Sequence, residues 1–348
     1  MADNSADDRK LPNYNLRYLI LLILTVICIF VSFVIGRFSL DISSAAPLMY
    51  MKILAFFDPN VILTQNYADY SVIFNIRFPR IVAALLVGSA LSVAGAAYQG
   101  MFQNPLVSPD ILGASAGAGF GAAVAILFGL GSTGIMVIAF FGGLAAVGAA
   151  YGVSLLSKGP STLSMVLAGI LISSLFSAGL SYIKLVADTT DELPAITYWL
   201  MGSLASMTWV HVVYVFPVML IGLIPLYLLK WRINILTLGE DEARSLGVNT
   251  SLLRLSVIVC ATLLTTAAVS ITGVIGWVGL VIPHFARMAF GCDYRRIIPV
   301  SVVMGAGFLL AVDDCARTMA TIEVPIGILT AFLGAPIFAY LLVTGGRK

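Results

Sequence analysis

The run IVAALLVGSALSVAGAAYQGM, residues 81–101, contains no charged side chain. An α-helix needs about 20 mostly apolar residues to cross the hydrocarbon core of a bilayer, so this run predicts a transmembrane helix. Comparable apolar runs occupy residues 18–37, 111–130, 134–156, 161–186, 208–229, 252–272, 297–312 and 325–343, with a shorter one at 276–290.

The composition agrees with a chain that crosses a membrane about ten times. Hydrophobic residues make up 60% of the chain and charged residues 10%, and the mean hydropathy is +1.02. Soluble domains contain only about 45–50% apolar residues. We therefore expect an all-α integral membrane protein, with a cytoplasmic tail at 1–17 and one polytopic domain of about ten helices in a compact bundle over 18–348.

No soluble domain fits in the connections between the predicted spans. The run at 18–37 is longer than the roughly 7–15 residues of a signal-peptide core, so we expect it to be retained as a helix. The longest connections are 38–72, in which 47–57 is interpreted as an interfacial piece, and 187–207, which holds Tyr198 and Trp199. These two residue types favour the membrane interface.

The basic residues predict which side of the membrane each connection faces. With the N-terminus in the cytoplasm and ten spans, 13 of the 19 lysines and arginines fall on the inner side, as the positive-inside rule favours. The inner set is Arg9, Lys10, Arg17, Lys158, Lys230, Arg232, Arg244, Arg254, Arg287, Arg295, Arg296, Arg347 and Lys348; the outer set is Arg37, Lys52, Arg77, Arg80, Lys184 and Arg317.

Several classes of function are disfavoured by what the sequence lacks. Four scattered cysteines without a CxxC pair and two histidines predict neither a disulfide framework nor a metal cluster. There is no GxxxxGK[ST] or HExxH motif. Asp313 and Asp314 form the only acidic pair within a span, and Arg317 stands four residues after Asp313, where mutual neutralisation is expected. We expect no catalytic residue, no cofactor in this chain and no nucleic-acid partner.

Small residues recur at intervals of four within the predicted spans. Gly113, Gly117 and Gly121 show this spacing, and Gly148 and Gly152 repeat it. Glycines four apart allow helix backbones to approach closely. The pattern predicts tight packing within the bundle.

The polar stretch TLGEDEARSLGV, residues 237–248, predicts a short amphipathic helix between two spans. Three acids occupy its first turn and Arg244 lies near its end, which complements the helix dipole. Ala243 and Leu246, three apart, are expected to share one face. Asn249 or Thr250 can cap the following span. The alternative is a solvated turn on the cytoplasmic surface.

Four stretches together resemble the FecCD family, the permease subunits of type II ABC importers. They are RFPRIVAALLVGSALSVAGAAYQGMFQNPLVSPDILGASAGAGFGA (77–122), GEDEARSLGV (239–248), ITGVIGWVGLVIPHFARM (271–288) and EVPIGILTAFLGAPIFAYLL (323–342). The resemblance implies ten helices, two cytoplasmic termini, a homodimer with the path at its two-fold axis, and weakly visible inverted halves formed by helices 2–5 and 7–10. Inverted halves suit alternating access.

The resemblance also implies a partner for the segment 237–250. It would dock in a groove of a separate ATPase subunit, present in two copies, which would bind the ATP and Mg²⁺ that this chain lacks. The residues implied in coupling are Gly239, Glu240, Asp241, Glu242, Ala243, Arg244, Leu246 and Gly247.

On the outer side, the resemblance implies that Arg77, Arg80 and Arg317 receive acidic groups of one periplasmic or lipid-anchored binding protein. Such charge pairs guide docking more than they add affinity. The alternatives are snorkelling to the interface and pairing with Asp313, Asp314 or Glu323.

The path itself is predicted from the fifth helix and the segment after it. The resemblance places them at the dimer axis, which nominates Ser173, Ser174, Ser177, Ser181, Met201 and Met207; helix packing explains the serines equally well. His284 is interpreted as structural, and His211, at the outer start of the sixth span, is a candidate contact for cargo.

These observations predict the permease of an ATP-driven importer in a prokaryotic cytoplasmic membrane, in contact with membrane lipid. The expected cargo is a ferric-siderophore or related iron complex, with haem, cobalamin or an oxyanion such as molybdate as alternatives. An ion-coupled secondary carrier would need charged residues in the middle of several spans, and a membrane-embedded enzyme would need a nucleophile with a base or a metal cluster.

Overall fold

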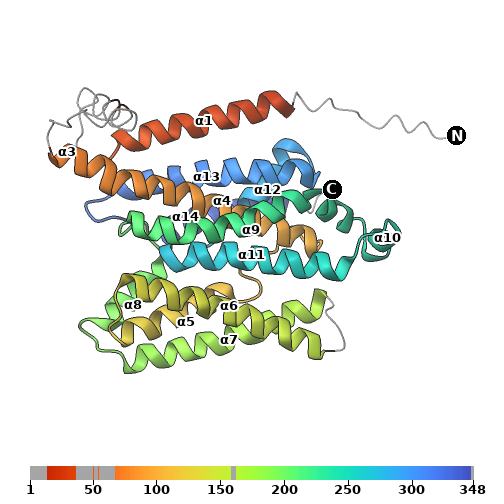
Figure 1. The fold of residues 1–348 in the computed structure, drawn as a ribbon, viewed down its shortest axis with the longest axis horizontal. Helices are drawn as coiled ribbons and strands as arrows, with labels where there is room; N and C mark the ends of the chain where they lie inside the picture. The colour runs from red at the N-terminus through yellow and green to blue at the C-terminus, as the bar shows by residue number, and fades with distance from the viewer. Residues whose placement is uncertain (1–13, 37–49, 51–53, 55–66, 158–161, 346–348) are drawn as a thin grey trace.

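The computed structural model describes residues 14–36, 50, 54, 67–157 and 162–345, which form helices and their connections with no strand among them. Outside these residues lie positions 1–13 of the predicted tail and most of the interfacial piece at 47–57. The same holds for seven of the basic residues named above: Arg9, Lys10, Arg37, Lys52, Lys158, Arg347 and Lys348. The start of α1 and the short α10 lie at one end of the bundle, and α3 and α8 lie at the other (Figure 1). We call these the inner and outer ends.

The helices follow one another along the chain. Their bounds are α1 Tyr14–Val34, α3 Tyr67–Ser71, the π-helix η1 Val72–Arg77, α4 Phe78–Met101, α5 Ala114–Leu127, α6 Ser132–Leu156, α7 Thr162–Val186, α8 Glu192–Met201, α9 Trp209–Leu236, α10 Glu240–Ser245, α11 Thr250–Thr272, α12 Val278–Phe290, α13 Tyr294–Thr318 and α14 Ile326–Gly345.

Seven of the described helices are long and apolar enough to cross a membrane: α1, η1 with α4, α6, α7, α9, α11 and α13. Three shorter apolar helices, α5, α12 and α14, complete the bundle. The all-α membrane fold is confirmed, while the count of ten crossings stays a prediction. The first helix begins at Tyr14 rather than at residue 18, and the connection 187–207 contains the ten-residue helix α8, which the sequence interpretation missed.

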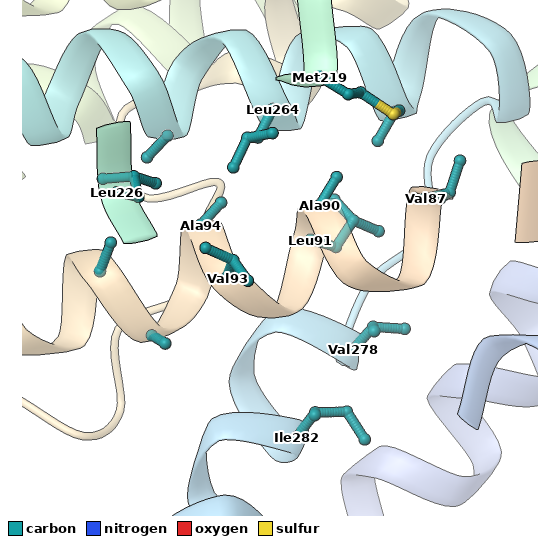
Figure 2. Close-up of a cluster of buried hydrophobic side chains, with 14 of the residues drawn as sticks. Val87, Ala90, Leu91, Val93, Ala94, Met219, Leu226, Leu264, Val278 and Ile282 are labelled. Carbon is teal, nitrogen blue, oxygen red and sulfur yellow. The ribbon is translucent and has the colours of Figure 1, made fainter. Parts of the chain in front are cut away.

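Helix α4, which contains the opening run, lies at the centre. Figure 2 shows its small and branched side chains between α9 and α11 on one side and α12 on the other. A side chain on Gly88 would come 2.2 Å from the carbonyl oxygen of Gly305 in α13, and one on Gly95 would come 1.7 Å from that of Gly279 in α12. Lipid tails are as apolar as leucine, so these close contacts, rather than transfer out of water, hold the helices together.

The predicted glycine contacts are confirmed in part. A side chain on Gly117 or Gly121 would collide with the backbone of α6 at 2.4–2.5 Å, so α5 packs against α6 through this stripe. A side chain on Gly148 or Gly152 would meet nothing within 4 Å, so the prediction was wrong for that pair within this chain.

The two predicted halves share an arrangement. In each, a long, deeply buried helix (α4 or α11) is followed by a non-helical segment (102–113 or 273–277) and then by a short helix (α5 or α12). Non-helical backbone within a bundle is tolerated where protein surrounds it or where it lines a cavity. These two segments are therefore the places to look for polar sites.

Candidate functional site

At the inner end, α10 forms an elbow between the long helices α9 and α11. It begins after Gly239, whose φ of 133° suits glycine, and ends before Gly247, whose φ is 79°. The side chain of Asn249 accepts a hydrogen bond from the backbone N–H of Leu252 at 3.0 Å, so it caps α11 as predicted. The elbow is therefore defined at both ends by local sequence signals.

Glu240 ties the elbow to α11. Its carboxylate lies 2.6 Å from Arg244 Nη2 in the same short helix and 2.7 Å from Arg254 Nη2 in α11. Thr250 Oγ1 lies 3.4 Å from the same carboxylate and accepts from Arg244 Nε at 3.3 Å. A movement of α10 would therefore carry the start of α11 with it.

The predicted apolar face of the elbow is divided in the structure. Ala243 is fully buried in the main core, whereas Leu246 is 60% exposed, so the prediction that they share a face was wrong. The helix ends at Ser245, and Leu246 leaves the helical spiral. The elbow presents the exposed side chains of Asp241, Glu242, Arg244, Ser245 and Leu246.

At the outer end, Arg80 is held between two carboxylates. Its Nη2 lies 2.9 Å from Asp313 Oδ1 and 3.0 Å from Glu323 Oε2, and its Nε donates to both oxygens of Asp313 at 3.0 Å. Arg80 is 5% exposed and Asp313 is fully buried. The contact joins α4 to α13 across 233 residues of sequence.

The other two outer arginines attach α1 to this network. Arg317 pairs with Asp314 and lies 3.2 Å from Asp313, and Ser32 of α1 accepts from Arg317 and donates to Asp314. Arg77 donates to the carbonyl oxygens of Phe33 and Val34 at the end of α1. Basic side chains at a helix C-terminus satisfy its last carbonyls.

The structure therefore shows the internal pairing that the sequence offered as an alternative for Arg80 and Arg317. All three outer arginines are buried in this chain. Their docking to a binding protein stays a prediction.

The predicted path serines lie on α7, a helix with little cover. Ser174, Ser177 and Ser181 are exposed and Ser173 is partly buried. The hydroxyls of Ser174 and Ser181 donate to backbone oxygens four residues earlier, at 2.8 and 2.9 Å. Large apolar side chains around them are exposed as well: Leu163, Leu167, Ile170, Leu171 and Leu175.

The two predicted methionines separate. Met201, at the end of α8, lines a cavity of about 640 Å³ between α8, segment 273–277 and α14; its other apolar walls include Leu200, Trp277 and Phe332. Met207 is 5% exposed and belongs to the main core. Met207 is not among the residues that line the cavity beside Met201.

The two histidines lie in different surroundings. The backbone N–H of Thr208 donates to Nδ1 of His211, which leaves Nε2 to donate to Ser132 Oγ at 2.8 Å, so His211 joins the outer starts of α6 and α9. His284 is partly buried on α12, one turn from Arg287, whose Nη1 donates to Gln99 Oε1 at 2.7 Å.

One carboxylate escaped the sequence analysis. Asp110 lies in the non-helical segment 102–113 and accepts a hydrogen bond from the backbone N–H of Ser115 at 2.6 Å. It lines a cavity of about 260 Å³ inside the bundle. The sequence offered one signal for it: by the predicted bounds, Asp110 lies in a connection of only nine residues, 102–110, between two apolar runs.

Comparison with known proteins gives a consistent picture. The profile of the FecCD transport family matches residues 23–344. The molybdate import system permease protein MolB of Haemophilus influenzae is 38% identical over 331 residues, which is 94% of this chain and 96% of MolB. A Helicobacter pylori protein named "Probable iron chelatin transport system permease protein" is 42% identical over 271 residues, covering 78% of this chain and 82% of that one.

A solved structure agrees with these relatives. It is described as a metal-chelate type ABC transporter in an inward-facing conformation, and it superposes with a TM-score of 0.83 at 37% identity. The match covers 95% of this chain and 99% of that one. The likeness therefore extends over nearly the whole bundle.

Proposed function

Because the chain belongs to the FecCD transport family and is a permease subunit of a type II ABC importer, we propose that it moves an iron complex of the ferric-siderophore class into the cytoplasm by alternating access. The cargo arrives on an external binding protein. The chain is a multi-pass protein of a prokaryotic cytoplasmic membrane. A separate subunit, of which the complex holds two copies, binds ATP and Mg²⁺ and hydrolyses the ATP.

The elbow is the observation that carries this proposal. Glu240 fixes α10 to Arg254, and Asp241, Glu242 and Leu246 face outward at the inner end. A short helix clamped to a long one acts as a lever, since a push on the exposed side chains moves α11. A closing ATPase dimer supplies such a push.

The cavity beside Met201 supports an organic complex as cargo. Its lining side chains are apolar, and no lysine or arginine is among them. Apolar cavities of this size suit small organic ligands, whereas a bare oxyanion calls for cationic or N–H donors. The likeness to MolB over nearly its whole length keeps an oxyanion as the second candidate.

The uncovered face of α7 supports a homodimer. Its exposed leucines lie beside Ser174 and Ser177, so a second copy packed there would cover both the leucines and the serines. The outer end is the surface proposed for the binding protein. There the described hydrogen bonds of Arg77 go to carbonyl oxygens of α1. Arg77, Arg80 and Arg317 remain the residues proposed to receive acidic groups of the binding protein.

Affinity purification of the tagged chain from its native membrane, followed by mass spectrometry, tests the proposal. We expect an ATPase subunit at one copy per permease chain and a binding protein that retains an iron complex. A binding protein loaded with molybdate instead would select the second candidate. A chain that elutes alone in several mild detergents would contradict the importer assembly.

A further inference from the structure

The cavity that contains Asp110 is separate from the one beside Met201 and has a different chemistry. Its polar walls are the side chains of Ser108, Asp110, Ser115 and Thr265. The proposed transport cycle assigns no role to it. A carboxylate inside a membrane protein is costly and usually marks a functional site.

Asp110 lies deep in the bundle. A side chain on Gly279 of α12 would come 2.4 Å from Pro109 Cγ and 2.5 Å from the carbonyl oxygen of Leu91, so Asp110 follows a residue packed at the level of Leu91. Leu91 stands ten residues before Met101, the inner end of α4, which corresponds to about 15 Å along the helix. The carboxylate is therefore inside the bundle, well away from the inner end of α4.

No arginine or lysine in the described part of the chain forms an ion pair with Asp110. Its hydrogen-bond partner is Ser115, at the start of α5, whose helix dipole compensates part of the negative charge. Every other described carboxylate either pairs with an arginine or lies at one end of the bundle. The charge of Asp110 leaves room for a cation.

The donor set indicates which cation. One carboxylate and three hydroxyl groups are hard oxygen ligands, and the non-helical segments 102–113 and 273–277 leave backbone carbonyls outside helical hydrogen bonding. Interrupted helices coordinate Na⁺ in this way. Among the described residues, no group of three or more histidine, cysteine or acidic side chains is placed so that it could hold a metal ion. A single negative charge suits a monovalent ion.

Val274, Gly276 and Trp277 line both this cavity and the one beside Met201, so Trp277 lies at the boundary between them. Its φ of 71° is an outlier for a bulky residue, and such strain persists only where the surroundings impose it. The indole packs against Gly334 of α14, where any side chain would come 2.5 Å from Trp277 Cβ, and against the edge of Phe338 at 6.0 Å between ring centroids.

We propose that the cavity binds one alkali-metal cation, Na⁺ or K⁺, through Asp110 and Thr265, and that Trp277 closes it from the neighbouring cavity. The ion would bridge the non-helical segment 102–113 and helix α11 of the other half. This site requires neither the ATPase nor the cargo, so it goes beyond the proposed function and can be tested on the isolated chain.

The experiment is a salt comparison on the purified full-length chain in detergent. The unfolding midpoint and tryptophan fluorescence are measured in NaCl, KCl and choline chloride at equal ionic strength. Because a ligand that binds the folded state stabilises it, we expect Na⁺ or K⁺ to raise the midpoint by at least about 2 °C over choline. Identical midpoints in the three salts would overturn the proposal without any variant.

Variants locate the site. Asp110→Asn is expected to abolish the cation dependence, and Thr265→Val to weaken the apparent affinity several-fold while leaving the fold intact. Asp188→Asn, an exposed outer carboxylate, is the matched control and should respond like the wild type. Trp277→Phe should keep the midpoint shift and lose the fluorescence change. A full cation response in both Asp110→Asn and Thr265→Val would place the ion elsewhere and overturn the assignment.

Discussion

Acid–arginine pairs occur at both ends of this bundle, but water reaches only one set. At the outer end, the side chains of Arg80 and Asp313 are 6% and 0% exposed. At the inner end, those of Arg244 and Glu240 are 58% and 33% exposed. The same type of ion pair is therefore buried at the outer end and exposed to water at the inner end.

The difference determines what each set can do. A buried pair has already lost its hydration, so removing one partner leaves a charge that nothing compensates. An exposed pair contributes little to stability because water competes for both groups. The outer network therefore fixes α1, α4 and α13 together, while the inner elbow holds its shape and still offers side chains to a partner.

Asp313→Asn is expected to have the largest effect. It removes the carboxylate shared by Arg80 and Arg317, at 2.9 and 3.2 Å, and breaking a buried pair costs about 3–5 kcal/mol. The measurement is the free energy of unfolding of the purified chain in mixed micelles.

Asp293→Asn makes the same chemical change at the inner end and is the control. Asp293 pairs with the exposed Arg295 at 2.8 Å and caps α13, and asparagine caps a helix equally well. Its expected cost is below about 1 kcal/mol. Equal losses for the two variants would contradict the distinction between the two ends.

The local parts of this comparison could be predicted from the sequence. Asn249 as a cap, the helix within 237–250 and the pairing of Asp313 with Arg317 depend on residues within four positions of one another. Helical periodicity and capping depend on residues this close in sequence, so both can be recognised from the sequence alone. The order of the four matching stretches came from the family resemblance.

The remaining parts could not be predicted, because they depend on contacts between distant segments. Asp313 is 233 residues from Arg80, and no local pattern links them. The depth of Asp110 depends on Pro109 packing against Gly279 in the other half. Ala243 is buried in the main core, whereas Leu246, three residues later, is 60% exposed. Each of these requires the folded bundle.

Glu240→Gln is expected to have a smaller effect on stability and a clear effect on coupling. It weakens the contacts to Arg244 and Arg254, at 2.6 and 2.7 Å, which are partly exposed, so the loss should be about 0.5–1 kcal/mol. With α10 released from α11, stimulation of ATP hydrolysis by loaded binding protein should fall several-fold. Asp241→Asn removes an acid from the same turn without breaking a described ion pair, and it should retain the stimulation. Unchanged stimulation in Glu240→Gln would show that the contacts of Glu240 with Arg244 and Arg254 do not transmit movement from α10 to α11.

Leu246→Ala is expected to leave stability unchanged and to act only on the partner. Leu246 is 60% exposed, and substitutions at such positions usually stay within about 0.5 kcal/mol of the wild type. A leucine that fills a groove of the ATPase subunit would lose buried area on truncation, worth about 1.5 kcal/mol or tenfold in affinity. Binding of the isolated ATPase subunit to the permease in nanodiscs measures this. Leu156→Ala, at the exposed inner end of α6, is the matched control and should bind like the wild type. Equal affinities for the two variants would mean that the exposed side of the elbow is not the contact, and that the inner end meets its partner through other residues.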